Sequence, residues 1–285
     1  MKKLIQRFLM FIIGLPLTVI IVVALPQKHH LVANITVILL SALGAVEFAE
    51  LLKQKNNVIS LAEAAILGAL SPLAMTLAVS FGLHGEVIPA AFILGAAWVL
   101  VSRVFVQEDK LRDVTGRAAA GFAVMMYPGL FMAWIIRMAL LDHADMVILM
   151  FLFMVIANDS TAWAAGLLFG KGNQGIIPVS PNKSVAGFIG GFVASVLVGL
   201  GAVLLVPEVF SSRRLPTIYA GIILGCISGI AAGLGDLGES AMKRSVQVKD
   251  SGSIIPGRGG VLDTIDSICL AAPVYYASYW FLFGL

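Results

Sequence analysis

A stretch near the carboxyl end of this chain, between Leu234 and Asp266, brings nine charged residues together. The sequence around this stretch is strongly apolar, whereas the stretch itself combines acids, bases and glycines on both sides of a turn. Charged side chains in or beside a bilayer are costly, so by default they indicate a functional site. The candidate residues are Asp236, Glu239, Lys243, Arg244, Lys249, Asp250, Arg258, Asp263 and Asp266.

Two pairs of carboxylates in this stretch have helical spacing. Asp236 and Glu239 are three residues apart and Lys243 follows one turn later, so the three side chains share one helix face. Asp263 and Asp266 are likewise one turn apart at the start of the last apolar segment. Two such pairs form an oxygen-rich site that suits Mg²⁺ or a similar hard cation. The alternative is a solvated network in which these acids only pair with nearby lysines and arginines.

A glycine-rich loop separates the two acidic pairs. It contains Lys249-Asp-Ser-Gly252 and Pro256-Gly-Arg-Gly-Gly260. Glycines let backbone N–H groups approach a phosphate, and the neighbouring Lys and Arg side chains supply positive charge. Most glycine-rich loops are only turns. Because cations and a candidate metal site adjoin this one, we expect it to contact a phosphate.

A second polar loop contains Ser180-Pro-Asn-Lys-Ser184. Lys183 lies beside the hydroxyl groups of Ser180 and Ser184, a combination that suits a phosphate oxygen. The alternative is that Lys183 anchors the chain at the membrane surface and Ser184 caps the helix that follows.

Further acids interrupt the apolar segments. Asn158-Asp159-Ser160 lies within one of them, and a carboxylate in lipid requires a partner. We favour a functional role for this segment over a purely structural hydrogen-bonded network. Glu47 and Glu50 lie near the end of an earlier apolar segment. They could join the same site, but we favour side chains that extend to the membrane interface.

The composition indicates an integral membrane protein, so we expect membrane helices to position these residues. Of 285 residues, 59% are hydrophobic and 12% are charged, whereas soluble domains have about 25% charged residues. The mean hydropathy is +0.98. The net charge of +3 is small, and no long basic tract with interleaved aromatic residues occurs, which argues against nucleic-acid binding.

The apolar segments predict an all-α integral membrane protein with about nine spans, since a helix needs about 20 apolar residues to cross a bilayer. Lys2, Lys3 and Arg7 predict a cytoplasmic amino terminus, and span parity then places both polar loops on the cytoplasmic side. We expect one membrane domain, with 1–117 as a helical scaffold and 118–285 as the catalytic half. The predicted spans are 4–25, 31–52, 58–81, 86–106, 118–141, 145–169, 185–206, 217–235 and 262–284.

Several segments of the carboxyl-terminal half together form a many-position pattern. Ser240-Ala-Met-Lys-Arg244 is followed by Lys249-Asp-Ser-Gly252 and by Pro256-Gly-Arg-Gly-Gly-Val-Leu-Asp-Thr-Ile-Asp266. The pattern resembles the signature of the CTP:phosphatidate cytidylyltransferases, or CDP-diacylglycerol synthases. Gly235-Asp-Leu-Gly-Glu-Ser240, Asn158-Asp-Ser160 and Ser180-Pro-Asn-Lys-Ser184 with Gly187-Phe-Ile-Gly-Gly191 match further landmarks in the expected order. The first half resembles the family only in span number and hydropathy.

The resemblance implies an enzyme of the cytoplasmic membrane that transfers the cytidylyl group of CTP to phosphatidic acid. It implies Mg²⁺ bound by Asp236 and Asp263, with a second cation left open, and it suggests a homodimer. The implied catalytic residues are Asp236, Asp263, Lys249 and Asp250. The residues implied to hold substrates are Asp159, Ser160, Ser180, Lys183, Ser184, Glu239, Lys243, Arg244, Arg258 and Asp266.

This sequence departs from the family pattern at three places. Arg258 stands where the family usually has His, and Thr264 stands where it usually has Arg. Val185-Ala186 replace an aromatic-acid pair. The first two changes move a cation while preserving the total charge, whereas the third removes an acid.

Three other functions remain open at this point. A divergent CTP-dependent kinase or transferase acting on another lipid would use the same groups. A cation transporter could use Asp159, Asp236 and Asp263, although these acids cluster at one membrane face. The departures from the family pattern also allow an inactive paralogue that serves as a partner subunit.

Overall fold

The structure is a computed structural model that describes residues 12–54, 59–104 and 108–284. Apart from two isolated β-bridges, these residues form helices, turns and loops. The all-α prediction is therefore confirmed for the described part of the chain. The described residues divide into two compact units.

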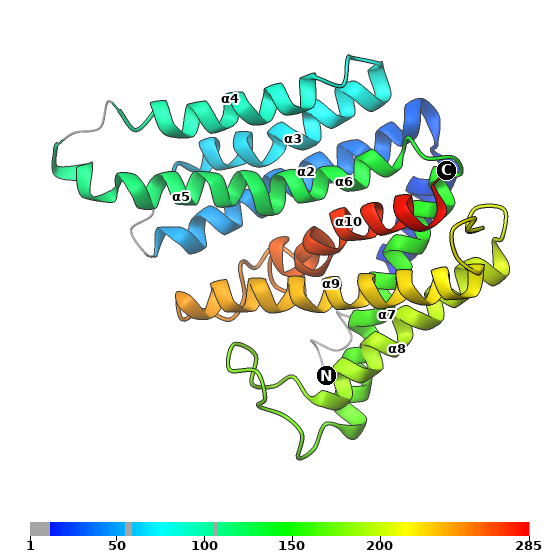
Figure 1. Cartoon of the computed structure of the whole chain (residues 1–285). Coiled ribbons are helices and arrows are strands. Elements are labelled where there is room, and N and C mark those ends of the chain that lie inside the picture. Colours follow the sequence, from blue (N-terminus) through cyan, green and yellow to red (C-terminus); the bar gives the residue numbers. More distant parts are fainter. Residues whose placement is uncertain (1–11, 55–58, 105–107, 285) are drawn as a thin grey trace. The chain divides into compact units, whose positions relative to one another are not determined.

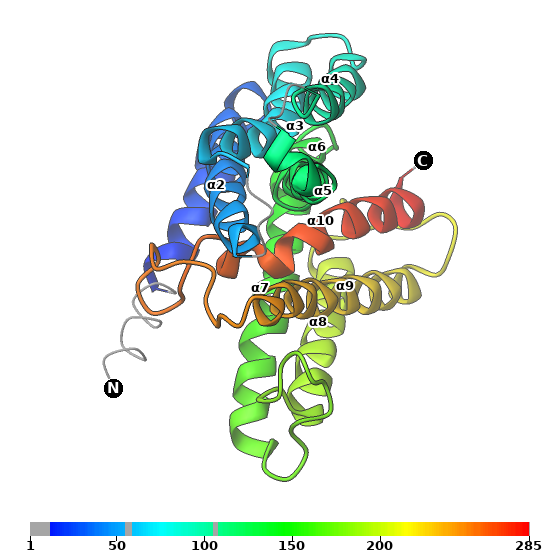
Figure 2. The same cartoon turned by 90° about the vertical axis from the view of Figure 1, so that its left-hand side faces the viewer.

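The first unit comprises the described residues up to Leu140 together with Ser245–Ile265. Figures 1 and 2 show its helices running alongside one another. Small residues let them approach closely: a Cβ at Gly129 of η3 would lie 3.1 Å from the carbonyl oxygen of Gly68 in α3. The elements are η1 (Ile20–Ala24), α2 (Gln27–Lys53), α3 (Leu61–Phe81), α4 (Val87–Val101), η2 (Glu108–Asp113), α5 (Val114–Val124), η3 (Met125–Leu130) and α6 (Phe131–Met138).

The second unit comprises Leu141–Arg244 and the described residues from Asp266 onward. Its elements are α7 (Ala144–Phe169), α8 (Val185–Leu205), nearly all of α9 (Thr217–Ser245) and most of α10 (Leu262–Phe283). Asn158 of α7 joins three helices, because its amide donates to Ser195 Oγ of α8 at 3.0 Å and to the Gly229 carbonyl of α9 at 3.3 Å. Tyr275 of α10 donates to the Val147 carbonyl of α7 at 3.1 Å. Buried polar groups thus hold the helices of this unit in register.

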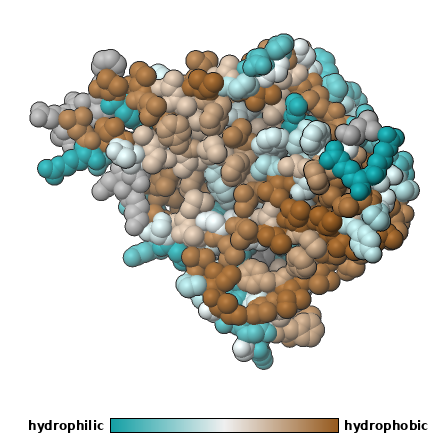
Figure 3. Space-filling model, in the orientation of Figure 1, coloured by the Kyte–Doolittle hydropathy of each residue, from teal (hydrophilic) through white to brown (hydrophobic). Residues whose placement is uncertain are grey.

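Six helices of the described chain are long and apolar enough to cross a membrane, which supports a multi-pass membrane protein. Large apolar side chains lie on the surface, Leu205 being 81% exposed, and hydrophobic residues cover much of the face in Figure 3. The six are Gln27–Lys53, Leu61–Phe81, Leu111–Met138, Ala144–Phe169, Val185–Leu205 and Thr217–Ser245.

The predicted number of nine spans is not confirmed. Ile12–Ala24 and Val87–Val101 are apolar but shorter than a bilayer requires. The last predicted span, α10, has sufficient length but is not among the six. Two aspartates and several tyrosines lower its average hydropathy.

Other predictions about topology stay predictions. The cationic residues that suggested a cytoplasmic amino terminus, Lys2, Lys3 and Arg7, lie outside the described residues, as does the start of the first predicted span. The division into a scaffold (1–117) and a catalytic half (118–285) also stays a prediction.

Candidate functional site

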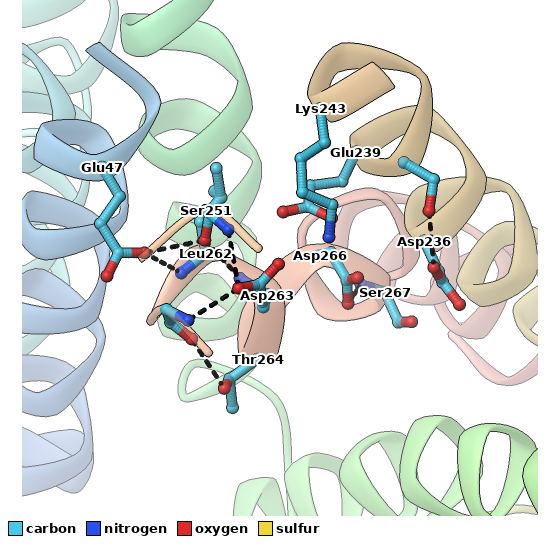
Figure 4. Close-up of polar contacts among 12 residues, drawn as sticks. Glu47, Asp236, Glu239, Lys243, Ser251, Leu262, Asp263, Thr264, Asp266 and Ser267 are labelled. Carbon is cyan, nitrogen blue, oxygen red and sulfur yellow. Dashed lines mark hydrogen bonds and ion pairs between the residues drawn. The ribbon is translucent and has the colours of Figure 1, made fainter. Parts of the chain in front are cut away.

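Four carboxylates gather in the second unit. Asp266 of α10 interacts electrostatically with Asp236 and Glu239 of α9 and with Asp159 of α7. Glu239 is fully buried and Asp266 is 8% exposed. Figure 4 shows Asp266 beside Glu239, with Asp236 on the same helix as Glu239. The predicted proximity of the acids of α9 to an acid of α10 is therefore present, and Asp159 belongs to the same cluster.

Two lysines accompany these carboxylates. The Nζ atom of Lys183, from the loop before α8, lies 2.5 Å from Asp236 Oδ2. Lys243 forms an ion pair with Glu239 one helical turn away, and both side chains are largely buried. Glu239 and Lys243 therefore share a helix face, as their spacing predicted. The cluster therefore has more carboxyl groups than lysines.

Close helix packing positions the cluster. The Gly235 position of α9 lies against α10: a Cβ there would come within 2.6 Å of the Asp266 carbonyl oxygen. Ser267 donates from its hydroxyl to Asp159 Oδ1 at 3.1 Å and from its backbone N–H to Asp266 Oδ1 at 2.6 Å. Asp159 thus has the partner that its place in an apolar segment requires. The neighbouring Ser160 is exposed.

Asp263, the other acid at the start of α10, lies in the first unit and organises the glycine-rich loop. Its Oδ2 atom accepts from the backbone N–H groups of Ser251 at 2.9 Å and Gly260 at 2.7 Å. The Asp263 N–H donates in turn to Ser251 Oγ at 3.2 Å (Figure 4). The carboxylate therefore joins the two ends of the loop.

The position of the Glu47 side chain, on α2, differs from the predicted one at the membrane interface. Instead of extending to the membrane interface, it is 3% exposed and lies against the same loop. It accepts from Ser251 Oγ at 3.1 Å and from the N–H groups of Val261 at 3.0 Å and Leu262 at 2.8 Å. The burial of these donors at the start of α10 draws the carboxylate inward, because helix-initial N–H groups need acceptors. Glu50 is exposed, as expected.

These contacts also change the interpretation of the glycine-rich loop. The sequence suggested that its backbone N–H groups approach a phosphate. Four of them, at Ser251, Gly260, Val261 and Leu262, donate to the carboxylates of Asp263 and Glu47 instead. Because these N–H groups are already hydrogen-bonded, a phosphate would bind to side chains of the loop instead. Three of these, Lys249, Asp250 and Arg258, are exposed.

Local turn chemistry shapes the middle of the loop. Pro256 and Gly257 are the central residues of a turn closed by a hydrogen bond from Arg258 N–H to the Ile255 carbonyl at 3.2 Å. Gly257 has a φ of 81°, which the third position of a type II turn requires and glycine adopts readily. This turn presents Arg258 at the surface.

The loop before α8 contains a structural residue, Ser184, next to the candidate phosphate ligand Lys183. Ser184 is the N-cap of α8, since its Oγ accepts from Gly187 N–H at 3.1 Å. The capping interpretation is therefore confirmed for Ser184. Ser180 is partly buried and takes part in turns through its backbone.

Arg244, a further predicted substrate-binding residue, lies at the end of α9 and is exposed.

No three His, Cys, Asp or Glu side chains within the described ranges are already arranged to hold a metal ion. The carboxylates of the second unit would have to draw together to ligate one. Asp236 belongs to the second unit and Asp263 to the first. Their shared binding of a cation therefore stays a prediction.

Multiple apolar helices, together with the acids and lysines gathered in the second unit, define a multi-pass membrane protein with a polar site. Residues 5–282 match the cytidylyltransferase family. Because this match covers nearly the whole chain, the protein belongs to that family.

Individual relatives agree with the family match. A phosphatidate cytidylyltransferase of Bacillus subtilis is 32% identical over 191 residues, which are 66% of this chain and 64% of the relative. Another of Chlamydia muridarum is 41% identical over 127 residues, 43% of this chain and 41% of the relative. The uncharacterized protein YnbB of Escherichia coli is 34% identical over 161 residues, 52% of this chain and 51% of the relative. The chain spans about half the length of the curated relatives it matches.

Proposed function

We propose that the protein is a phosphatidate cytidylyltransferase, which converts CTP and phosphatidic acid into CDP-diacylglycerol and pyrophosphate. The observation that carries this proposal is the family match over residues 5–282. Relatives from Bacillus subtilis and Chlamydia muridarum are named for this activity. We further propose that the reaction takes place at the cytoplasmic face of the cytoplasmic membrane, in a homodimer.

The proposed reaction needs positioning more than proton transfer. A phosphate oxygen of phosphatidic acid attacks the α-phosphorus of CTP, and the bond from that phosphorus to the leaving pyrophosphate oxygen breaks. The attacking oxygen is already ionised, so that electrostatic stabilisation and orientation supply most of the catalysis. Arg244, Lys249 and Arg258 are exposed to an incoming phosphate.

Lys183 is the phosphate ligand that the contacts of the second unit favour most. Its side chain is 26% exposed and already neutralises one carboxylate, Asp236, whose side chain is 32% exposed. In the proposed complex the ammonium group exchanges part of this contact for a substrate phosphate. Lys243 is more deeply buried beside Glu239, so we assign it to the balance of charge around the acids.

The chemistry of the donor set fits Mg²⁺. Carboxylate oxygens are its preferred protein ligands, and the cluster of the second unit has more carboxylates than lysines. Asp236 belongs to this cluster, and we propose it as a metal ligand together with Asp263, the second ligand that the family resemblance implies. Mg²⁺ held by these residues would supply positive charge that balances the charge developing on the phosphates.

The proposal is tested with purified protein, phosphatidic acid and CTP labelled at either the α- or the γ-phosphate. Label from the α-position is expected in the lipid and label from the γ-position in pyrophosphate. Transfer of the γ-label to the lipid, with release of CDP, would instead identify a lipid kinase. Cation flux into liposomes without nucleotide would favour a transporter.

A further inference from the structure

We propose that Glu47 is a positioning residue for this reaction, one that fixes the glycine-rich loop and thereby the orientation of Asp263. The inference rests on the proposed function in one respect: it takes Asp263 to act on the substrates or their metal. The contacts that carry it all lie within the first unit.

Glu47 uses both of its carboxylate oxygens. Oε1 accepts from Val261 N–H, and Oε2 accepts from both Leu262 N–H and Ser251 Oγ. A buried carboxylate is unfavourable unless it is well hydrogen-bonded, and three donors provide that compensation. Its negative charge also lies at the N-terminal end of α10, where the helix dipole stabilises an anion.

Ser251 connects Glu47 to Asp263. Its hydroxyl donates to Glu47 Oε2 and accepts from Asp263 N–H, while its own backbone N–H donates to Asp263 Oδ2. Figure 4 shows Glu47, Ser251 and Asp263 joined in this way. Loss of the Glu47 carboxylate therefore removes the acceptor that fixes the Ser251 hydroxyl. Because Ser251 also holds Asp263, the orientation of Asp263 changes with it.

Two glycines make the approach of Glu47 possible. A Cβ at Gly252 would collide with Glu47 Oε1, and one at Gly260 would collide with Glu47 Oε2 and Ser251 Oγ. The glycines of this loop thus admit a carboxylate of the protein itself. This explains their presence without a bound phosphate.

The experiment compares Glu47→Gln with Glu50→Gln, an exposed glutamate one turn further along α2. Glutamine keeps the size of Glu47 but replaces one acceptor oxygen with an NH₂ donor, so at least one of the three donors loses its partner. Two properties are measured in the full-length protein: backbone amide hydrogen exchange in the 251–262 loop, and kcat and KM for CDP-lipid formation. Ser251→Ala is a second variant, because it removes the connecting hydroxyl and leaves Glu47 in place.

We expect faster exchange at the amides of residues 251–262 in Glu47→Gln and wild-type exchange in Glu50→Gln. We also expect kcat to fall about 100-fold, the effect typical of a misplaced catalytic group, with KM for phosphatidate changed less than about threefold. Ser251→Ala should lower kcat similarly, and the double variant should lose little more than either single variant.

The other possible results distinguish a purely structural role of Glu47 from a failure of the proposed function. If Glu47→Gln lowers only thermal stability, while kcat and loop exchange stay at wild-type values, Glu47 is a structural residue and the inference is wrong. If the wild-type protein does not form CDP-lipid, the proposed function fails instead. The exchange measurement then still tests whether Glu47 fixes the loop: equal exchange in Glu47→Gln and Glu50→Gln would overturn that part of the inference.

Discussion

Glu47 and Ser251 are 204 residues apart in the sequence, yet the Ser251 hydroxyl donates to the Glu47 carboxylate at 3.1 Å. The contact joins a residue near the end of the second predicted span to the loop before the last predicted span. It shows that the amino-terminal helices do more than support the carboxyl-terminal motifs: one of them contributes a carboxylate to the loop that contains Asp263.

The ion pair between Lys183 and Asp236 should behave as one functional unit. We expect Lys183→Met and Asp236→Asn each to lower kcat/KM by about 100-fold, because in the proposed reaction Lys183 binds a substrate phosphate and Asp236 binds the metal ion. The double variant should lose much less than the product of the two effects, since both changes disrupt the same contact. Steady-state kinetics test this, with the exposed Lys171→Met of the same loop as the control. Fully independent losses would show that the pair is incidental.

The buried pair of Glu239 and Lys243 should matter asymmetrically for stability. Lys243→Met leaves Glu239 buried close to Asp266, so we expect a loss of about 3–5 kcal/mol in the free energy of unfolding. Glu239→Gln should cost less, because the neutral amide can still accept a hydrogen bond from Lys243 and no longer repels Asp266. Unfolding in detergent measures both variants, and the exposed Arg244→Met serves as the control. A larger loss for Glu239→Gln would contradict this account of the charges.

Two glycines of α9 provide a matched test of helix packing. A Cβ at Gly225 would lie 2.6 Å from the Ser195 carbonyl oxygen of α8, whereas one at Gly233 would meet nothing within 4 Å. We expect Gly225→Ala to destabilise the protein by about 1–3 kcal/mol through overpacking. Gly233→Ala should be neutral or stabilising by up to about 1 kcal/mol, because alanine favours helix. Equal thermal midpoints for the two variants would refute the close approach of α8 and α9.

Binding of Mg²⁺ should be detectable without any turnover. A ligand that binds only the folded protein raises its stability, by about 2.7 kcal/mol at a concentration 100-fold above Kd. We expect Mg²⁺ to raise the thermal midpoint of the wild-type protein, and the increase to be lost in Asp236→Asn. The exposed Glu86→Gln is the control. The same increase in all three proteins would argue against Asp236 as a ligand.

Local features could be predicted from the sequence. The span expected at 185–206 is observed at Val185–Leu205, and Ser184 caps it as its residue type suggested. The span expected at 31–52 also agrees, because Lys28, His29 and His30 have positive φ values and regular helix begins after them. These features depend on hydrophobic length and on capping chemistry, which a few neighbouring residues determine.

The contacts of the site could not be predicted in the same way. Lys183 and Asp236 are 53 residues apart, and no spacing rule pairs them. Membership of the site is one of the two predicted possibilities for Glu47, and the general rule that an acid within an apolar segment is a functional candidate favours it. Sequence alone favours the interface for Glu47, because its hydrogen-bond donors at the start of α10 are more than 200 residues away in the chain.

The central claim is tested most directly by the products formed from CTP and phosphatidic acid with purified protein. The account predicts one pyrophosphate for each CDP-diacylglycerol, with both products reduced together in Asp236→Asn. Release of CDP with a newly phosphorylated lipid, or wild-type turnover in Asp236→Asn, would contradict it.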